Sequence, residues 1–372
     1  MKRTRTKTVT FHRAHNYGAV LQAYALQNYL ETIGYENTII DYINPLIEKT
    51  YKPFYLPYNN LKDNAKRTIR NIWYYHKNIK RINQFKQFNV KYLKTTKPLK
   101  SIKDVQEAAN GDTLITGSDQ VWNRNITGGL SDIFTLNFGT GNKISYAASV
   151  GNNELLTEYR DEYRKKISSI KHLSVREEST SEIINNELSL GSKVVLDPVF
   201  LLESNKWEEL ARQNSKANIK KPYIFAYMIK YDKRLVEAAN LLSNKTNLPI
   251  IDNELRNKGY NNRAQTIYTK GPWDFIKAII GADYVVTQSF HATVFSILFH
   301  KKFFVIPHPV NGARTIDLLK KYNLSDREFH NTDELSRKDI DKESDWTEID
   351  KAIKHDIKNS KEWLKNALEE KN

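Results

Sequence analysis

The chain has 372 residues, of which 58 are Lys or Arg and 43 are Asp or Glu, so its formal net charge is +15. This length allows two domains of about 150 residues each. The absence of cysteine excludes disulfides, thiolate catalysis and cysteine-ligated zinc. No apolar stretch reaches the roughly 20 residues of a spanning helix, and the basic N-terminus leads into a strand pattern rather than a signal peptide. We therefore expect a soluble, cytoplasmic protein with an anionic partner: nucleic acid, an anionic membrane surface or phosphorylated small molecules.

The chain begins with a strand, a turn and a helix. Residues 8–11 favour a strand, residues 19–34 an amphipathic helix, and residues 37–43 a second, apolar strand. This order is Rossmann-like. The turn contains Gly18 but not the GxGxxG fingerprint, so the sequence does not support dinucleotide binding.

Two residues at the mouth of this turn are candidate ligands of a substrate. His15 and Asn16 can hydrogen-bond a sugar or an anion. His12 lies close to His15 in the sequence, but no acidic residue or third histidine lies near them. We therefore predict no metal site.

Residues 51–100 interleave aromatic and basic side chains with few acids. One interpretation is an ordinary solvated helical insertion in the first domain. Another is an interfacial surface, because Trp, Tyr and Phe beside Lys and Arg suit the headgroup layer of an anionic membrane. Nucleic acid is a weaker alternative, since no recognised nucleic-acid motif accompanies the charge.

A strand at residues 112–116 runs into Ser118, Asp119 and Gln120. Small and polar residues at such a place occur in structural loops, but they also bind hydroxyl-rich substrates. Asp119 can accept a hydrogen bond from a sugar hydroxyl. These three residues are therefore candidate acceptor ligands.

Arg176 follows a short strand at residues 173–175. A guanidinium at the end of a strand can hold phosphate or carboxylate with two parallel hydrogen bonds. An ion pair with a nearby acid is the alternative. The remaining elements expected in this part are strands at 143–150 and 194–196 and helices at 155–172 and 179–188.

The alternation of strands and helices begins again after Pro198, which predicts a domain boundary there. The first domain then comprises residues 1–198, the second residues 199–335, and a helical tail residues 336–372. The second domain is expected to contain helices at 207–214, 234–243 and 273–281 and strands at 223–229 and 248–251.

The most informative stretch comes next. Residues 284–286 and 303–306 are apolar runs that predict buried parallel strands. Apolar residues between them recur at helical spacing, and Ser289 stands where an N-cap belongs. His291 then lies at the carboxyl end of a strand and the N-terminus of a helix, where open α/β sheets bind ligands and backbone N–H groups attract anions. A lone histidine there is often only a satisfied surface residue, but its position suits a general acid or base.

Seven segments together resemble, in order and spacing, the polysaccharide pyruvyltransferase family. They are TFHRAHNYGAVLQAYAL, TGSDQVWN, SYAASVG, LSVREES, LDPVF, ADYVVTQSFHATVFSILFHKKFFVI and ARTIDLLKKYNL. The resemblance spans roughly residues 8–327. It implies an α/β fold of two Rossmann-like domains facing a cleft, as in GT-B glycosyltransferases, with the acceptor side in the first domain and the donor side in the second.

The resemblance also implies a reaction. A carboxyethylidene group moves from phosphoenolpyruvate to two hydroxyls of a sugar, which forms a cyclic pyruvate ketal and releases phosphate. No cofactor is expected besides this co-substrate. Acceptors in such pathways are often sugars on polyprenyl diphosphate at the cytoplasmic membrane face, and peripheral contact of residues 51–100 with that face would fit.

By the same resemblance, His291 is the acid/base and Arg176 a donor ligand. Characterised members tend to carry an arginine two residues before this histidine, where the present chain has Ser289. The second cation must then come from elsewhere. We expect Arg314, the Ser289 hydroxyl and the amides of the helix N-terminus to share the donor anion.

Two alternatives remain open. The first is a GT-B glycosyltransferase that uses a nucleotide sugar, and the second is a non-enzymatic basic module that binds membranes or nucleic acid through residues 51–100. A response to phosphoenolpyruvate would mark the pyruvyltransferase and a response to a nucleotide sugar the glycosyltransferase. Salt-sensitive binding to vesicles or nucleic acid, without a small-ligand response, would mark the binding module.

Overall fold

The computed structural model describes residues 4–52, 68–69, 72–109, 111–308 and 312–370. Its internal contacts divide the chain into two compact units: residues 1–201 with 359–372, and residues 202–358. The first unit ends close to the boundary predicted after Pro198. The predicted tail from residue 336 is divided between the two units. Residues 53–67 and 70–71 of the predicted insertion lie outside the described residues.

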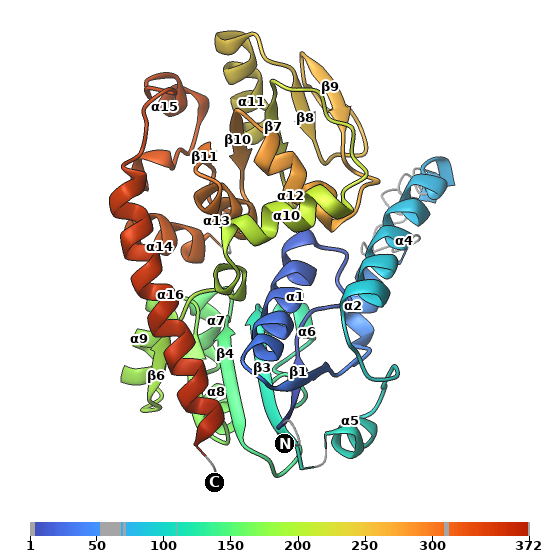
Figure 1. Ribbon diagram of the computed structural model, residues 1–372, viewed down its shortest axis with the longest axis vertical. Helices are drawn as coiled ribbons and strands as arrows, with labels where there is room; N and C mark the ends of the chain where they lie inside the picture. Colours follow the sequence, from blue (N-terminus) through green and yellow to red (C-terminus); the bar gives the residue numbers. More distant parts are fainter. Residues whose placement is uncertain (1–3, 53–67, 70–71, 110, 309–311, 371–372) are drawn as a thin grey trace. The chain divides into compact units, whose positions relative to one another are not determined.

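The first unit contains a parallel sheet whose described strands follow the order β2-β1-β3-β4-β5-β6 (Figure 1). The strands are β1 (Arg5–Val9), β2 (Glu36–Ile39), β3 (Thr113–Asp119), β4 (Lys143–Ala148), β5 (His172–Val175) and β6 (Ser192–Val194). The helices are α1 (Tyr17–Thr32), α2 (Pro45–Thr50), α4 (Tyr75–Tyr92), α5 (Ile102–Ala108), α6 (Arg124–Thr127), α7 (Asn153–Glu158), α8 (Arg160–Ile167), α9 (Glu178–Asn186) and the 3-10 helix η1 (Pro198–Leu201). The strand order reverses direction between β1 and β3, as in doubly wound α/β sheets.

The second unit contains a parallel sheet whose described strands follow the order β11-β10-β7-β8-β9. The strands are β7 (Ile224–Tyr227), β8 (Ile250–Asp252), β9 (Arg263–Thr266), β10 (Tyr284–Thr287) and β11 (Lys302–Val305). The helices are α10 (Ser204–Asn214), α11 (Lys233–Thr246), α12 (Pro272–Gly281), α13 (Phe290–Leu298), α14 (Ala313–Lys321), the 3-10 helix η2 (Ser325–Arg327) and α15 (Thr332–Ser336). Here the order reverses between β7 and β10, which is the Rossmann arrangement.

The last helix, α16 (Trp346–Glu369), belongs to both units, because the division falls between Lys358 and Asn359. Among the described residues, no helix is both long and apolar enough to cross a membrane.

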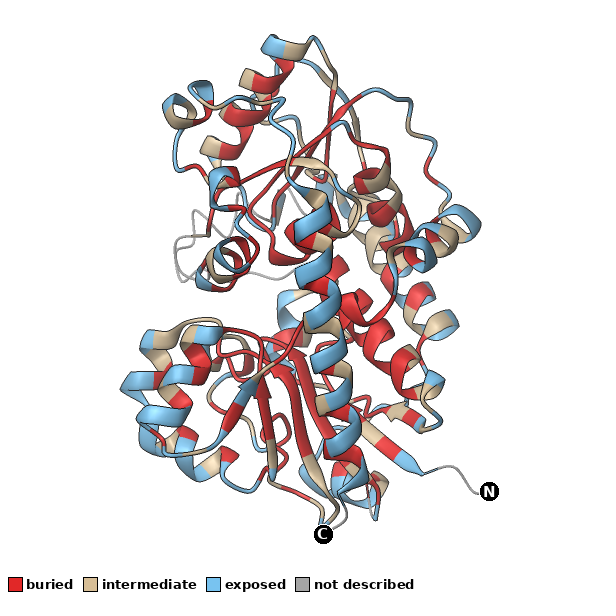
Figure 2. Cartoon of the chain, turned by 60° about the vertical axis from the view of Figure 1, so that its left-hand side comes forward, coloured by how far each residue is buried: buried red, intermediate tan, exposed pale blue. Residues whose placement is uncertain are grey.

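The strands of both sheets are largely buried (Figure 2). All four residues of β10 are buried, as the apolar run in the sequence predicts. Each fully buried large apolar side chain contributes about 1.5–3 kcal/mol. In the first unit, Trp122 is fully buried and its indole N–H donates to Phe134 O at 3.0 Å, while Phe11 packs edge-on against Phe134 at 5.1 Å between ring centroids. A cluster of buried apolar residues packs on each sheet.

Two predicted elements differ clearly from the structure, and one strand was not predicted. The single helix expected at 155–172 is two helices, α7 and α8, with a break at Tyr159. Strand β6 lies at Ser192–Val194 rather than 194–196. Strand β9 was not predicted, because Arg263–Thr266 contains no apolar run and lies at the edge of its sheet.

Gly117 in β3 is the glycine whose replacement should disturb the first unit most clearly. Its φ is +113°, and an added Cβ would lie 2.2 Å from Tyr146 O. Gly117→Ala should therefore lower the free energy of unfolding by roughly 3 kcal/mol or more, measured by urea denaturation. Gly191→Ala is the matched control, because an added Cβ there meets nothing within 4 Å. Equal stability of the two variants would show that the close contact between Gly117 in β3 and Tyr146 in β4 does not require glycine.

Candidate functional site

In the first unit, a glutamine and a threonine connect the carboxyl ends of β1 and β3, where the strand order reverses. Gln22 in α1 donates from Nε2 to Thr10 Oγ1 at 2.8 Å, and its side-chain oxygen Oε1 accepts from Ser118 N at 3.2 Å. Thr10 Oγ1 in turn donates to Ser118 O at 3.2 Å. These bonds fix the predicted acceptor residue Ser118 at the edge of the sheet, where α/β folds bind ligands.

Ser118 and Arg176 meet at one buried carboxylate. Ser118 Oγ lies 3.1 Å from Asp197 Oδ2, and Arg176 Nη1 donates to the same oxygen at 2.7 Å. The side chain of Arg176 is 2% exposed and that of Asp197 is fully buried. The structure therefore brings together two residues that the sequence assigned to different substrates, through an aspartate that the sequence did not single out.

Two further carboxylates face the same guanidinium. Arg176 Nε lies 3.3 Å from Glu177 Oε1, and Nη2 lies 3.8 Å from Asp119 Oδ1. Burial disfavours the charged guanidinium, but Glu177, Asp197 and Asp119 outweigh it and raise the pKa of Arg176. Since three carboxylates surround one cation, the local charge opposes the binding of a phosphate or carboxylate by Arg176. The arrangement is better suited to positioning Ser118 and Asp119.

Asp119 and Gln120 lie where β3 ends. Asp119 has a left-handed backbone, with φ of +71°, and its Oδ1 accepts from Gln120 N at 2.9 Å. The side-chain oxygen Gln120 Oε1 accepts from Asn123 Nδ2 at 2.7 Å. Left-handed non-glycine residues are uncommon and concentrate at ligand sites. The Asp119 carboxylate is held at this edge by its own backbone geometry.

The other two predicted acceptor residues lie beside α1. Asn16 caps this helix, because its Oδ1 accepts from Ala19 N at 3.3 Å. The ring of His15 lies 5.0 Å from that of Tyr51 and 5.5 Å from that of Phe85 between centroids. His15 and Tyr51 line a cavity of about 390 Å³, together with residues of the segment 41–52 and of α4.

His12 has a partner that the sequence did not reveal. Its Nε2 lies 2.8 Å from Asp41 Oδ1 at the end of β2, so the expectation that no acid lies near this histidine is wrong. The parallel pairing of β1 and β2 brings the two residues together. Among the described residues, no three His, Cys, Asp or Glu side chains are grouped as metal ligands.

His15 has a strongly shifted pKa. Burial, with smaller contributions from the positive charges of Arg81, Lys86 and Arg13, lowers it to about 4. Near neutral pH the imidazole is therefore uncharged, with one donor and one acceptor nitrogen. An uncharged imidazole suits a sugar hydroxyl better than an anion. Of the two ligands predicted for His15 from the sequence, a sugar or an anion, the structure therefore favours the sugar.

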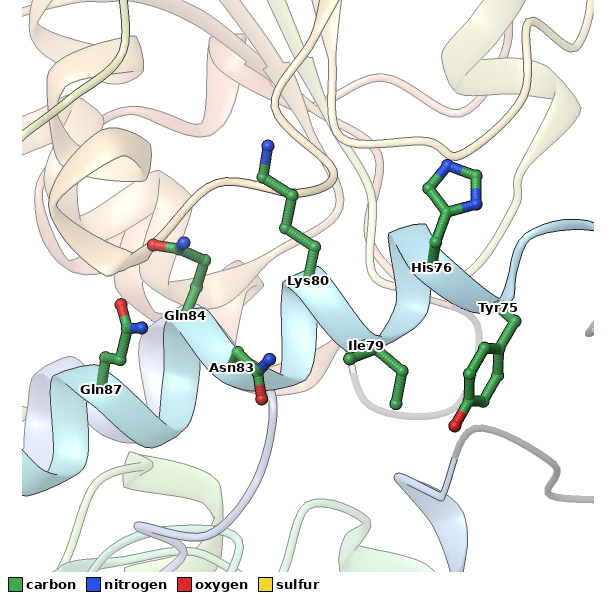
Figure 3. Close-up of a pocket in the computed structure, with 7 residues that line it drawn as sticks. All are labelled: Tyr75, His76, Ile79, Lys80, Asn83, Gln84 and Gln87. Atoms are coloured by element: carbon green, nitrogen blue, oxygen red, sulfur yellow. The ribbon is translucent and has the colours of Figure 1, made fainter.

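A second hollow has a volume of about 480 Å³, and the described residues that line it all belong to α4 (Figure 3). The labelled side chains, from Tyr75 to Gln87, recur at helical spacing along this one helix. Because these side chains lie along one face of one helix, they do not indicate a catalytic or binding site.

In the second unit, the carboxyl ends of β7 and β10 are joined where the strand order reverses. Thr287 Oγ1 donates to Tyr227 O at 2.9 Å, and Gln288 Nε2 donates to Lys230 O at 2.5 Å. The loop after β7 is thereby held against the corner that contains His291. A threonine and a glutamine thus bridge the reversal point in both units.

The corner after β10 has the predicted cap. Ser289 Oγ accepts from Ala292 N at 3.3 Å, and Ser289 N donates to Thr287 Oγ1 at 3.0 Å. His291 follows in the first turn of α13 and is 6% exposed. A hydroxyl that accepts at a helix N-terminus still carries its own proton, which it can donate to an anion.

The structure brings Arg314 to the same corner. Its guanidinium carbon lies 5.6 Å from the centroid of the Phe290 ring, and the ring of His291 lies 5.3 Å from that centroid on an edge-to-face approach. Phe290 therefore contacts both the predicted acid/base and the predicted second cation.

Sequence reasoning missed two further basic side chains near this corner, Lys230 and His308. Burial, followed by the positive charges of Arg314 and Lys230, lowers the pKa of His308, and the carboxylate of Asp232 opposes this shift. Lys230 follows β7 and His308 follows β11, both at the carboxyl edge of the sheet. Parallel strands present their carboxyl ends at one edge of the sheet, so the residues that follow β7 and β11 could have been identified as candidate ligands from the sequence.

Arg176 should contribute to stability through its carboxylate partners. Arg176→Ala leaves Asp197 and Glu177 buried without this cation, and should lower the free energy of unfolding by roughly 3–5 kcal/mol in urea denaturation. Arg160→Ala, an exposed arginine of the same unit, should change it by less than about 0.5 kcal/mol. If Arg176→Ala were equally mild, Arg176 would be available for the predicted donor role.

His15 should make stability depend on pH. Its pKa of about 4 in the folded protein lies below the ordinary value of 6.5, so the unfolded state binds the proton more readily. Neutral His15 therefore contributes to the free energy of unfolding above pH 6.5. This contribution, at most about 3 kcal/mol, is lost as the pH falls towards 4. In urea denaturation between pH 7 and 4.5, His15→Asn should lose less stability than the wild type. If the free energy of unfolding of the two proteins changed equally with pH, the lowered pKa of His15 would be contradicted.

Solved structures with a similar fold cover nearly the whole chain. UDP-GlcNAc 2-epimerase from Neisseria meningitidis, solved bound to UDP-GlcNAc, has a TM-score of 0.53 at 9% identity and covers 99% of each chain. The spinosyn forosaminyltransferase SpnP has a TM-score of 0.50 at 12% identity and covers 99% of this chain and 100% of its own. Identities this low show the fold alone. They confirm the predicted class, α/β with two Rossmann-like units of the GT-B type.

At the level of sequence, no curated protein matches the chain. The family model described as polysaccharide pyruvyl transferase matches residues 16–309. This range includes His15's neighbour Asn16, the Ser118–Asp197 network and the His291 corner. The chain therefore belongs to the polysaccharide pyruvyl transferase family and is a transferase.

Proposed function

We propose that the protein transfers a carboxyethylidene group from phosphoenolpyruvate to two hydroxyls of a sugar of a cell-surface polysaccharide. The products are a cyclic pyruvate ketal and phosphate. The observation that carries this proposal is the corner of the second unit, where a buried histidine and an arginine contact one phenylalanine ring at the reversal point of the sheet. Membership of the family supports the same reaction class.

The donor needs cations and N–H groups, because phosphoenolpyruvate carries a phosphate and a carboxylate. Arg314, Lys230 and His308 supply positive or titratable groups at this edge. The first turn of α13 adds the positive end of the helix dipole, which favours an anion, while the N–H group of Ala292 donates to the Ser289 cap. Ser289 adds a hydroxyl in place of the arginine expected from other family members. The anion is thus shared among several groups rather than held by one guanidinium.

His291 is proposed as the acid. Its proton passes to the methylene carbon of phosphoenolpyruvate, while a sugar hydroxyl forms a bond to the neighbouring carbon and returns its own proton to the imidazole. Cleavage of the bond from that carbon to the phosphate oxygen then releases phosphate and gives an oxocarbenium ion. The second hydroxyl adds to this ion and loses its proton to the departing phosphate, which completes the ketal. A positioned acid of this kind contributes typically about 10²–10⁴-fold.

The acceptor is assigned to the edge of the first unit. Asp119 presents a carboxylate that can accept from a sugar hydroxyl, and Ser118 and Gln120 flank it in β3 and the following turn. Arg176 acts here as a positioning residue, since it is paired with Asp197 and Glu177. Neutral His15 and the cap residue Asn16 complete the predicted acceptor set.

The nucleotide-sugar alternative has weaker support, because the matching family model is that of polysaccharide pyruvyl transferases. The second unit also lacks the dinucleotide fingerprint, in which an acid at the end of the second strand binds the ribose and a glycine-rich turn follows the first strand. Asp252 ends β8 but is fully buried and paired with Arg263, at 2.7 Å between Nε and Oδ2. The turn after β7, MIKYD, contains no glycine. The ribose-binding position is therefore already used by an internal ion pair.

Contact of residues 51–100 with an anionic membrane, and a polyprenyl-diphosphate-linked acceptor, stay predictions. In the described part of this segment, Trp73 is 75% exposed and Val90 is 87% exposed on or beside α4. Large exposed apolar side chains next to lysines suit a headgroup layer.

The proposed roles of His291 and Arg314 can be separated. His291→Asn should reduce phosphate release from phosphoenolpyruvate, measured with a panel of sugar acceptors, by about 10²–10⁴-fold while donor binding persists. Arg314→Ala should instead weaken the binding of phosphoenolpyruvate by about 10–100-fold in calorimetric titration. Arg337→Ala is the control, because it removes an exposed arginine of the same unit. Full activity of His291→Asn would remove His291 from the mechanism, and unchanged binding by Arg314→Ala would move the anion site.

A further inference from the structure

The cavity beside α1 has more cationic than acidic side chains. Its two acids, Asp41 and Glu48, both contact Arg13, and the distance from Arg13 Nη1 to Asp41 Oδ1 is 2.8 Å. Lys52, after α2, and Lys86, in α4, add two further cations to the lining. The contributions of Lys86 and Arg13 to the lowered pKa of His15 show that their positive field reaches the cavity. An anionic group is therefore favoured there.

The same cavity also has groups that suit a sugar ring. Tyr51 and His15 lie with their rings 5.0 Å apart between centroids, and aromatic faces bind the apolar face of a ring. Asn89 contributes an amide from α4, and its Nδ2 is held by His12 O at 2.8 Å. Neutral His15 offers one donor and one acceptor. The lining therefore combines a charged part with an aromatic, hydrogen-bonding part.

We propose that this cavity binds a sugar carrying an anionic group such as phosphate, with the ring against Tyr51 and His15 and the anion at Lys52 and Lys86. The volume of about 390 Å³ lies in the range of small-molecule sites, about 300–1,000 Å³. That this ligand is the acceptor rests on the proposed function. The cavity and the acceptor carboxylate belong to the same unit, and burial, followed by the charge of Asp119 and opposed by that of Arg81, raises the pKa of Tyr51 to about 12.

Calorimetric titration of the full chain tests the chemical class of the ligand. The probes are the 1-phosphates of glucose, galactose, mannose and N-acetylglucosamine, the matching methyl glycosides, and inorganic phosphate. At least one sugar phosphate should bind about tenfold or more tightly than both its methyl glycoside and inorganic phosphate. Equal binding of the glycoside would overturn the role of the anion, and equal binding of inorganic phosphate would overturn the role of the ring. Absence of binding by all four sugar phosphates would overturn the proposal.

Two lysines of α4 provide matched variants. Lys86→Ala should weaken binding of the sugar phosphate by about tenfold and leave binding of the glycoside unchanged. Lys80→Ala removes the same charge from the same helix but does not line this cavity, so it should have no such effect. An equal loss in both variants would show only a general effect of charge and would overturn the assignment.

Binding of phosphoenolpyruvate by the same variants separates this proposal from the proposed function. It depends on Arg314 in the second unit, so Lys86→Ala should retain it. If the wild-type protein binds phosphoenolpyruvate but none of the four sugar phosphates, the cavity proposal alone is overturned. If it binds a sugar phosphate but not phosphoenolpyruvate, the pyruvyl-transfer function is overturned and the cavity proposal stands.

Discussion

In each of the two parallel sheets, the described strands include one neighbouring pair from which the chain continues in opposite directions. No crossover helix among the described residues covers the sheet edge between the ends of these two strands. This constraint decides where polar side chains can gather. Between β1 and β3, Gln22 and Thr10 connect the strand ends, and between β7 and β10, Gln288 and Thr287 do so. The hydrogen bonds satisfy buried backbone groups that would otherwise cost about 1–3 kcal/mol each. They also hold the adjoining residues, which are those with the chemistry, in fixed positions.

The carboxyl edges of the two sheets differ in charge. This difference supports the proposal that the first unit binds the sugar acceptor and the second unit binds the donor. At the edge of the first unit, three carboxylates surround Arg176, so the residues there favour hydroxyl donors and disfavour anions. At the edge of the second unit, Arg314 and Lys230 act together on His308 and favour an anion. A sugar acceptor and a doubly anionic donor require these two opposite environments. The fold itself is shared with enzymes of other activities and does not distinguish between them.

Much of this arrangement could be predicted from the sequence, because it depends on local patterns. Apolar runs identified β10 and β11, and the spacing after Ser289 identified its cap and the start of α13. What could not be predicted depends on which distant residues meet. Asp41 reaches His12 through strand pairing, and Asp197 reaches Arg176 across β5 and β6. Glu177 lies next to Arg176 in the sequence, but this proximity alone does not distinguish a guanidinium that binds substrate from one that binds internal carboxylates. The edge strand β9 was missed because its residues are only partly buried and carry no apolar pattern.

The central claim is that the chain recognises phosphoenolpyruvate, and the most direct measurement is its thermal stability with this ligand, in parallel with inorganic phosphate and UDP-sugars. A ligand at 100 times its dissociation constant stabilises the native state by about 2.7 kcal/mol, which raises the midpoint by several degrees. Phosphoenolpyruvate should raise the midpoint beyond the effect of phosphate, and UDP-sugars should not. Selective stabilisation by a UDP-sugar would instead assign the cationic edge of the second unit to a nucleotide diphosphate and would exclude recognition of phosphoenolpyruvate there.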